Sequence, residues 1–245
     1  MKRLFTLLAL TITFSMNAQL TAVTEGGNTG QRLSTSNASN HGDIGSNAVD
    51  LSYSSSSSST RGASGNYAVA MGINSTASGD YSTALGYYSV ASGGYGAIAM
   101  GNQTTASGDN STVMGEGGTA SGAASTAMGR GTTASDYASL VIGQYNSSGS
   151  SVTNNATSFS TSNTAFVIGN GTNTSNKSDA FKVMFNGDTT IAGDLNINSD
   201  ARFKANIKSL GGTLAKLLQI DGKTYTLKKD QSEKQKIGVL AQEIK

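Results

Sequence analysis

The feature that most constrains this chain is an internal repeat with a period of 14 residues. From about residue 60 to residue 145, the triplet Ala-Ser-Gly returns in steps of 14, with one step of 15. An aliphatic residue followed by glycine returns in the same phase. The aliphatic members of this mark are Met71, Leu85, Met100, Met114, Met128 and Ile142. A fixed period indicates one small unit stacked on itself, so the repeat decides the architecture.

A 14-residue period favours short strands over helices. Each period holds one short apolar stretch and several glycines, and each glycine costs a helix roughly 1 kcal/mol relative to alanine. A coiled coil would need two apolar positions in every seven residues. Two short strands and two turns fit the period, and successive coils would stack as parallel strands about 4.8 Å apart. We therefore expect a mainly β fold, a parallel β-roll, with Met71 and its equivalents buried in register.

The irregularities of the repeat are also informative. The one extra residue falls between Gly93 and Met100, and a further aliphatic-glycine pair, Ile168-Gly169, follows an irregular insertion. A strict phase over six periods argues against disordered low complexity, which the serine run at 54–59 would suggest if taken by itself. Each coil would bury only two or three small side chains, which is too little for a freestanding monomer. We therefore expect several chains to associate.

Composition excludes most kinds of catalytic and metal site. The 245 residues include no Cys, no Pro and no Trp. This rules out disulfide scaffolds, cysteine-bound zinc, iron–sulfur clusters and thiol nucleophiles. His41 is the only histidine, and its NASNHGD context predicts a loop. Asp80, Asp109 and Asp136 recur near the predicted turns, where turn formation explains them better than calcium, which needs six to eight oxygen ligands. We expect no metal and no cofactor.

Six tyrosines leave two interpretations open. They either form an exposed ligand-binding surface or pack between coils, and we favour packing because aromatic side chains dominate small cores. The residues concerned are Tyr67, Tyr81, Tyr87, Tyr88, Tyr95 and Tyr137.

The N-terminus has the pattern of an export signal. Lys2 and Arg3 precede the apolar run LFTLLALTITF, and Ala18 before Gln19 offers a cleavage point. The run of 11 apolar residues is shorter than the roughly 20 that a membrane span requires. We expect residues 1–18 to be removed and the mature protein to be secreted or held at the cell surface, without a transmembrane segment.

Charge divides the mature chain near residue 198. Residues 19–198 carry a net charge of −5 and residues 199–245 a net charge of +5, a step that marks a boundary. The basic residues of the tail alternate with apolar and acidic ones, so we expect no nucleic-acid binding. We expect a polar, serine-rich segment at 19–60, the 14-residue repeats at 61–170, a β neck at 171–198 and a separate small α+β domain from 199.

The repeat motifs resemble the head repeats of YadA-like trimeric adhesins. The motifs are NYAVAMG (66–72), YSTALG (81–86), NSTVMG (110–115), ASTAMG (124–129) and YASLVIG (137–143). The resemblance covers about residues 60–170. It implies a left-handed parallel β-roll from each of three chains, with the aliphatic positions facing inward, and an adhesive role at a surface.

The tail shows different local patterns. FKVMFNG and TTIAGDLNI alternate apolar and polar residues, as short strands do. Further along, residues 210–220 have helical spacing, residues 223–227 predict a strand after the Asp221-Gly222 turn, and residues 237–244 are compatible with a helix.

The tail resembles the N-terminal part of the intramolecular chaperone domain that ends endosialidases and phage tail spikes. The resemblance rests on SDARFKANI, on the strand around Tyr225 and on IGVLAQE. It implies trimerisation, help in folding β-helical stalks and serine-type self-cleavage. The family's nucleophile falls on Ser199 and its lysine on Lys204, so the cut would lie between Asn198 and Ser199. Phe203 departs from the smaller aliphatic residue that is usual there.

The chemistry of Ser199 and Lys204 can also be judged from the two residues alone. A serine hydroxyl needs a base, and a lysine serves once burial lowers its pKa. The alternative is that Ser199 caps a turn and Lys204 is a solvated charge. We expect at most a single turnover per chain. We also expect it only in a form that carries the complete chaperone domain, whose second half would follow Lys245.

Two functions of different classes remain. The first is an exported homotrimeric adhesin-like fibre, secreted or on the cell surface, that binds a host or matrix ligand and carries a C-terminal chaperone. The alternative is a phage-type tail fibre or spike with a self-cleaving chaperone tail. The export signal favours the first, because phage fibres assemble in the cytoplasm.

Overall fold

The structure is a computed structural model that describes residues 20–147, 155–194, 222–225 and 235–238. The chain divides into two compact units after Leu195. The described residues are almost entirely β. The 3₁₀ turn η1 (Ala38–Asn40) is the only helical element among the described residues.

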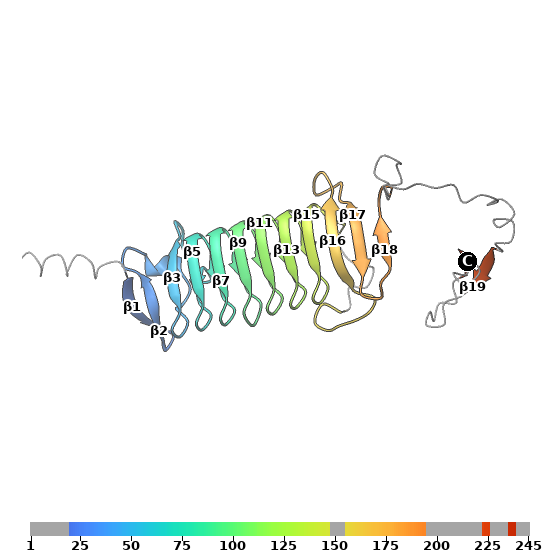
Figure 1. Ribbon diagram of the computed structural model, residues 1–245. Coiled ribbons are helices and arrows are strands. Elements are labelled where there is room, and N and C mark those ends of the chain that lie inside the picture. The colour runs from blue at the N-terminus through green and yellow to red at the C-terminus, as the bar shows by residue number, and fades with distance from the viewer. Residues whose placement is uncertain (1–19, 148–154, 195–221, 226–234, 239–245) are drawn as a thin grey trace, which may run out of the picture. The chain divides into compact units, whose positions relative to one another are not determined.

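The first unit is a β-solenoid in which the coils from β3 to β14 each contribute one long and one short strand, and two further long strands follow (Figure 1). The long strands are β3 (Val49–Tyr53), β5 (Val69–Ile73), β7 (Thr83–Tyr87), β9 (Ile98–Asn102), β11 (Thr112–Glu116), β13 (Thr126–Arg130), β15 (Leu140–Gln144) and β16 (Thr164–Asn170). The short strands are β4 (Gly62–Ala63), β6 (Thr76–Ala77), β8 (Val90–Ala91), β10 (Thr105–Ala106), β12 (Thr119–Ala120) and β14 (Thr133–Ala134). Neighbouring long strands pair in parallel, and so do neighbouring short strands, which confirms the predicted roll.

The strand register follows the sequence repeat residue by residue. Leu85 pairs with Met100 across the step of 15. Since Asp80 pairs with Tyr95, the extra residue is confined to the turn that precedes Tyr95. Ile142 pairs with Ile168, so the insertion also leaves the phase unchanged.

At both ends of the parallel stack, strands pair in the antiparallel direction. At the N-terminal end, β1 (Leu20–Glu25) pairs antiparallel with β2 (Asn28–Leu33), and β2 pairs in parallel with β3. At the other end, β17 (Asp179–Met184) pairs antiparallel with β16 and β18 (Thr189–Ile191) antiparallel with β17, as the alternating pattern predicted. The solenoid therefore begins before the first Ala-Ser-Gly triplet, within the segment that the sequence presents as polar and serine-rich.

Small side chains fill the interior of the coils. One buried column comes from the long strands and another from the short strands. The first contains Ala70, Ala84, Ala99, Val113, Ala127, Val141 and Val167. The second contains Ala63, Ala77, Ala91, Ala106, Ala120 and Ala134. Buried serines and threonines occupy the corners, where the Ser75 hydroxyl lies 3.0 Å from the carbonyl oxygens of Met71 and Gly86.

The prediction that Met71 and its equivalents are buried within the chain is wrong by one residue. Met71 is 41% exposed, Leu85 39% and Met128 38%, and the other three members are partly exposed. Side chains alternate across a strand, so the buried position is the preceding Ala or Val. Apart from Ile44 near the N-terminal end, the apolar interior of the described coils holds only alanine and valine, and the larger side chains of the repeat point outward.

The glycine after each outward aliphatic residue is a steric requirement. Gly101 has φ +131°, and a Cβ there would collide with the carbonyl oxygen of Gly115 in the next coil. The same relation holds at Gly72, Gly86, Gly115, Gly129 and Gly143. Glycine alone permits both the positive φ and the close approach of two backbones.

A buried charge cluster closes the N-terminal end of the solenoid. Arg32 Nη1 lies 2.7 Å from Glu25 Oε1, and its Nε lies 3.3 Å from Asp50 Oδ2. Arg32 Nη2 donates to the carbonyl oxygen of Gly42 at 2.9 Å. His41, expected in an ordinary loop, is buried in this cluster, with Nδ1 2.9 Å from Asp50 Oδ2.

The electrostatics of this cluster favour an ionised Asp50. Burial by itself raises the pKa of Asp50, but the contact with His41 and the hydrogen bonds from Ser52 outweigh burial and leave the pKa below its ordinary value of 3.8. Ser52 donates from its backbone N–H at 3.0 Å and from its hydroxyl at 2.6 Å. The carboxylate is thus held charged in the interior by compensating donors.

Within the second unit, the described residues form one antiparallel pair, β19 (Lys223–Tyr225) with β20 (Lys236–Gly238). The strand predicted after the Asp221-Gly222 turn is confirmed for residues 223–225. Ile237 and Gly238 are in a strand, although the sequence was compatible with a helix from 237. The helix predicted at 210–220 lies outside the described residues.

The glycine column can be tested by adding a single methyl group. Gly101→Ala should destabilise the fold by about 3 kcal/mol or more, because backbone atoms cannot move aside as a side chain would. Urea unfolding followed by circular dichroism measures the change. Gly117→Ala is the matched control, since Gly117 has φ +63° and open space around the added Cβ. It should cost only about 1 kcal/mol of left-handed strain. Equal losses in the two variants would contradict the steric account.

The charge cluster predicts a pH dependence of stability. The folded-state pKa of Asp50 is lowered, so its contribution is complete above its ordinary value of 3.8 and is lost as the pH falls through the folded-state pKa. Asp50→Asn should cost about 3 kcal/mol at pH 5, because Arg32 loses its buried partner. The gap to the parent should narrow in urea titrations as the pH falls below 3.8. The exposed Asp43→Asn variant should unfold with the parent at pH 7. A gap that widens as the pH falls below 3.8 would contradict this role for Asp50.

Candidate functional site

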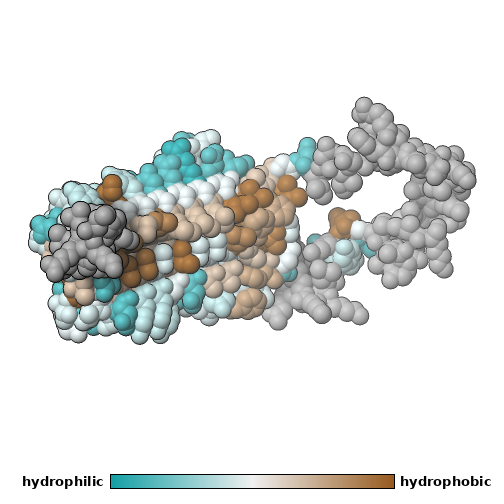
Figure 2. All heavy atoms as spheres, turned by 60° about the vertical axis from the view of Figure 1, so that its left-hand side comes forward, coloured by the Kyte–Doolittle hydropathy of each residue, from teal (hydrophilic) through white to brown (hydrophobic). Residues whose placement is uncertain are grey.

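The outer face of the long-strand sheet carries a continuous column of large aliphatic side chains. The strand register aligns Leu51, Met71, Leu85, Met100, Met114, Met128, Ile142 and Ile168. We call this set the aliphatic column. Figure 2 shows apolar residues running as a band along the flank of the solenoid. A contiguous apolar surface of this length marks an interaction site in a soluble protein.

The two sides of the aliphatic column differ in character. On one side lie mainly apolar or β-branched residues: Val49, Val69, Thr83, Ile98, Thr112, Thr126, Leu140 and Phe166. On the other side Tyr53, Ile73 and Tyr87 are followed by polar residues in the later coils. Glu116 and Arg130 form an exposed ion pair there, with 3.4 Å between Nε and Oε2. The apolar face is therefore widest over the N-terminal coils.

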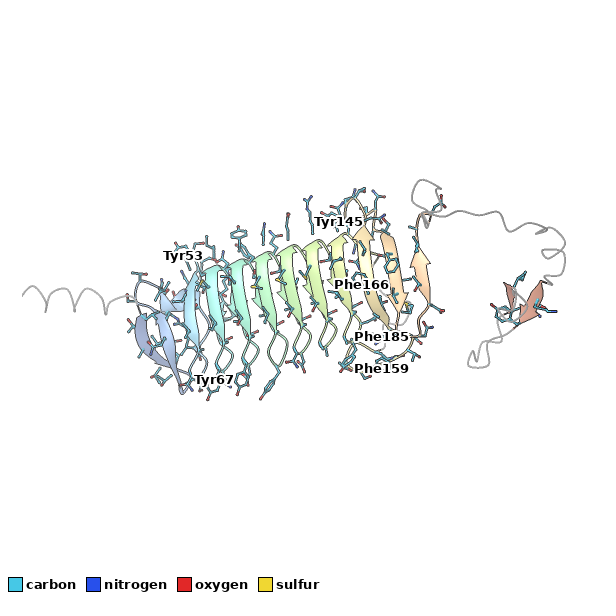
Figure 3. All side chains as sticks on the ribbon, in the orientation of Figure 1. Tyr53, Tyr67, Tyr145, Phe159, Phe166 and Phe185 are labelled. Atoms are coloured by element: carbon cyan, nitrogen blue, oxygen red, sulfur yellow. The ribbon has the colours of Figure 1, made fainter. Side chains whose placement is uncertain are left out.

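Tyrosines gather at one turn edge of those same coils. The rings of Tyr67 and Tyr81 stack with centroids 5.1 Å apart and an interplanar angle of 2°, and Tyr95 follows at 5.3 Å and 38°. All three side chains are about half exposed. We call these three residues the tyrosine ladder. Figure 3 places Tyr67 at this edge and Tyr53 and Tyr145 at the opposite one. The packing between coils that the sequence favoured is present for these three rings, although they remain about half exposed.

Asp80 and Asp136 act in turns, as the sequence predicted. Asp80 Oδ1 accepts from the backbone N–H of Asn66 at 2.9 Å, and Asp136 Oδ2 accepts from that of Thr164 at 2.8 Å. No cluster of residues suited to hold a metal ion is found among the described residues. A cavity of about 10 Å³ near Asp136 and Asp179 is the size of one water molecule. Burial raises the pKa of Asp179 there, against a hydrogen bond from the Ser147 backbone.

The predicted catalytic pair lies outside the described residues. The structure therefore places neither Ser199 nor Lys204, nor the bond after Asn198. The sequence analysis also missed two arrangements that the structure shows, the charge cluster around Arg32 and the outward aliphatic column. The strict alternation of Ala or Val with Met or Leu was the signal for the second. No local motif indicated the charge cluster around Arg32, because its members come from four separate segments of the chain.

In the described part of the chain, no helix is both long enough and apolar enough to span a membrane.

Comparison with known proteins assigns both segments of the chain to families. Residues 63–89, 92–116 and 120–146 match the YadA head domain repeat. Residues 199–245 match the chaperone of endosialidase. No curated protein and no solved structure matches the chain. The sequence resemblances are confirmed in the same order along the chain. The chain thus joins a solenoid of YadA head repeats to an endosialidase-type chaperone segment, the architecture of an adhesin-like or tail-fibre-like protein.

Proposed function

We propose that the protein is an exported, homotrimeric, adhesin-like fibre whose C-terminal segment assists assembly of the trimer. The observation that carries the proposal is the aliphatic column, which is continuous over the coils and only partly covered within one chain. The described coils bury little beyond alanine, serine and valine. Burying the column against other copies would add the large apolar contacts that each chain lacks.

Three chains are favoured over two by the families of both segments. YadA head repeats form trimers, and the endosialidase-type chaperone is also a trimerising domain, so the two segments agree on one stoichiometry. A trimer would bring three aliphatic columns together around a common axis. The turn edges, where the tyrosine ladder lies, would then be available for contacts with other molecules.

The site of action follows from the N-terminus and the head repeats together. Residues 1–18 have the pattern of an export signal, and the YadA-type head supports an extracellular or surface location. The alternative of a phage-type tail fibre is supported by the chaperone match, whose family includes endosialidases. An adhesin-like fibre agrees better with an export signal.

We further propose that the chaperone segment cuts the chain once, between Asn198 and Ser199. Lys204, neutral in a desolvated pocket, would accept the proton of the Ser199 hydroxyl. The hydroxyl oxygen would attack the carbonyl carbon of Asn198, giving an ester as the peptide nitrogen leaves with a proton. Water would then hydrolyse the ester. Because only the assembled domain can lower the lysine pKa, cleavage would follow trimer formation.

Assembly can be tested through the aliphatic column. Light scattering on residues 19–245 should give about three chain masses. Met100→Asp combined with Met114→Asp should lower the mass toward one chain, because unpaired charges would enter an apolar interface. Asn102→Asp is the matched control on the polar side of the face and should remain trimeric. A folded monomer of the parent, or a trimeric double variant, would contradict assembly through this face.

Self-cleavage can be tested by intact mass spectrometry. A form that carries the complete chaperone domain should lose its tail before Ser199 after assembly. Ser199→Ala and Lys204→Ala should both stay whole, and Lys208→Ala should be cut like the parent. A cut that persists in the Ser199 and Lys204 variants, or an assembled parent that stays whole, would leave Ser199 as a turn cap.

A further inference from the structure

The tyrosine ladder is not required by the turn that carries it. Tyr67 and Tyr81 occupy one position of the coil, and both have φ +57°. The equivalent position is filled by Gly96, Asn110 and Ala124 in later coils, with φ between +54° and +59°. The same turn therefore closes without an aromatic side chain.

Tyrosine is a costly choice at that position. A bulky residue in the left-handed region costs of order 1 kcal/mol, whereas glycine and asparagine enter it readily. Tyr67 and Tyr81 bear this cost in consecutive coils, whereas Gly96 and Asn110 reduce it and Ala124 and Ala138 bear it with a small side chain. A bulky aromatic residue therefore stands at a position that smaller residues can fill.

Nor does the proposed assembly face use these rings. The aliphatic column lies on the outer face of the long strands, and the tyrosine ladder lies in the turns that precede them. The ladder is also confined to the N-terminal coils. In later coils the positions equivalent to Tyr95 hold Asp109, Ala123 and Tyr137.

The geometry of the ladder suits a polymer. Successive rings are 5.1 and 5.3 Å apart, so they repeat at nearly constant spacing along the solenoid axis. All three rings are about half exposed along the turn edge, whereas small-molecule ligands are usually held in concave sites. Stacking fixes the rings in advance, so little side-chain entropy is lost when a partner binds.

The polar groups around the ladder suit a ligand that is rich in hydroxyl groups. In the next coil, the equivalent turn carries the exposed side chains of Asp109 and Asn110. Asn110 donates its backbone N–H to the carbonyl oxygen of Tyr95. The neighbouring tyrosines and Asp80 raise the pKa of the Tyr81 hydroxyl, with Tyr95 making the largest contribution. That hydroxyl therefore remains protonated at neutral pH and can both donate and accept hydrogen bonds.

The charge distribution excludes an anionic ligand. From residue 62 to residue 116 the sequence contains no lysine and no arginine. Arg61 contacts Tyr88, at the opposite turn edge from the ladder. A sulfated or carboxylated polymer would find no counter-charge and would meet Asp80 and Asp109. A neutral ligand meets neither difficulty.

From these observations we propose that Tyr67, Tyr81 and Tyr95 bind a strand of neutral polysaccharide that lies along the solenoid axis, with one sugar unit at each tyrosine. The inference rests on the proposed adhesive role and names the chemical class of its ligand. Because the ring faces are stacked on one another, each sugar lies across the exposed edge of a ring. Its hydroxyls bond to the tyrosine hydroxyls and to the carboxylates and amides of the turns.

The test uses the purified full-length chain and six-unit oligosaccharides of β-1,4-linked glucose, N-acetylglucosamine and mannose. Binding is measured by calorimetry and by tyrosine emission, which no tryptophan obscures. The triple variant Tyr67→Asn/Tyr81→Asn/Tyr95→Asp introduces residues that the same positions carry in other coils. It should keep the parent's circular dichroism and unfolding midpoint and weaken binding about tenfold or more. The matched control is Tyr87→Asn at the opposite edge, where the next coil has Asn102, and it should bind like the parent.

Four outcomes would overturn the inference. The first three are a parent that binds none of the three oligosaccharides, a triple variant that binds as well as the parent, and a lysine-rich decapeptide that binds in place of the sugars. In the fourth, light scattering shows that the triple variant loses its oligomeric mass, which would assign the ladder to assembly. A parent that is trimeric and attaches to matrix-coated surfaces, but binds no oligosaccharide, would sink this inference and leave the proposed function standing.

Discussion

The width of the coil interior is the constraint on which the rest of the structure depends. Two backbone segments face each other across a space that admits alanine, serine, threonine and valine, and Ala84 and Ala91 of one coil are both fully buried. The aliphatic side chains are therefore displaced to the outer face. The glycines that follow them let neighbouring coils approach closely. A core of this kind supplies little apolar burial per residue, and the larger aliphatic side chains of the repeat stay at least partly exposed on the outer face.

The sequence predicted the architecture well because one period of the repeat corresponds to one whole coil of the solenoid. A period of 14 residues specifies two strands and two turns, and a pairing register in which Met100 follows Leu85. It could not specify which face of the strand is interior. Met71 and Ala70 are both apolar, and an alternation of two apolar residues gives no polar side by which to orient the strand. The width of the coil interior decides which of the two residues is buried, and that width depends on both strands of the coil.

The candidate sites were less accessible to sequence reasoning. His41 appeared as an isolated loop residue because its partner, Asp50, lies on the following strand β3, where Asp50 also contacts Arg32 of β2. The stacking of Tyr67 on Tyr81 is implied by their spacing of 14. The exposure of the rings, however, depends on a turn conformation that the residue type disfavours. Ser199 and Lys204 were identified through resemblance, since their spacing of five residues does not place them on one helical face.

The two antiparallel ends give the solenoid a property that its middle lacks. Every internal coil offers an equivalent parallel edge to the next, while β1, β17 and β18 pair antiparallel at the two ends. The number of internal coils is therefore independent of the structure of the ends. A 14-residue unit added or removed between them changes the length of the solenoid by one strand spacing and leaves both ends intact. Related proteins can therefore vary in length through unequal exchange of repeats.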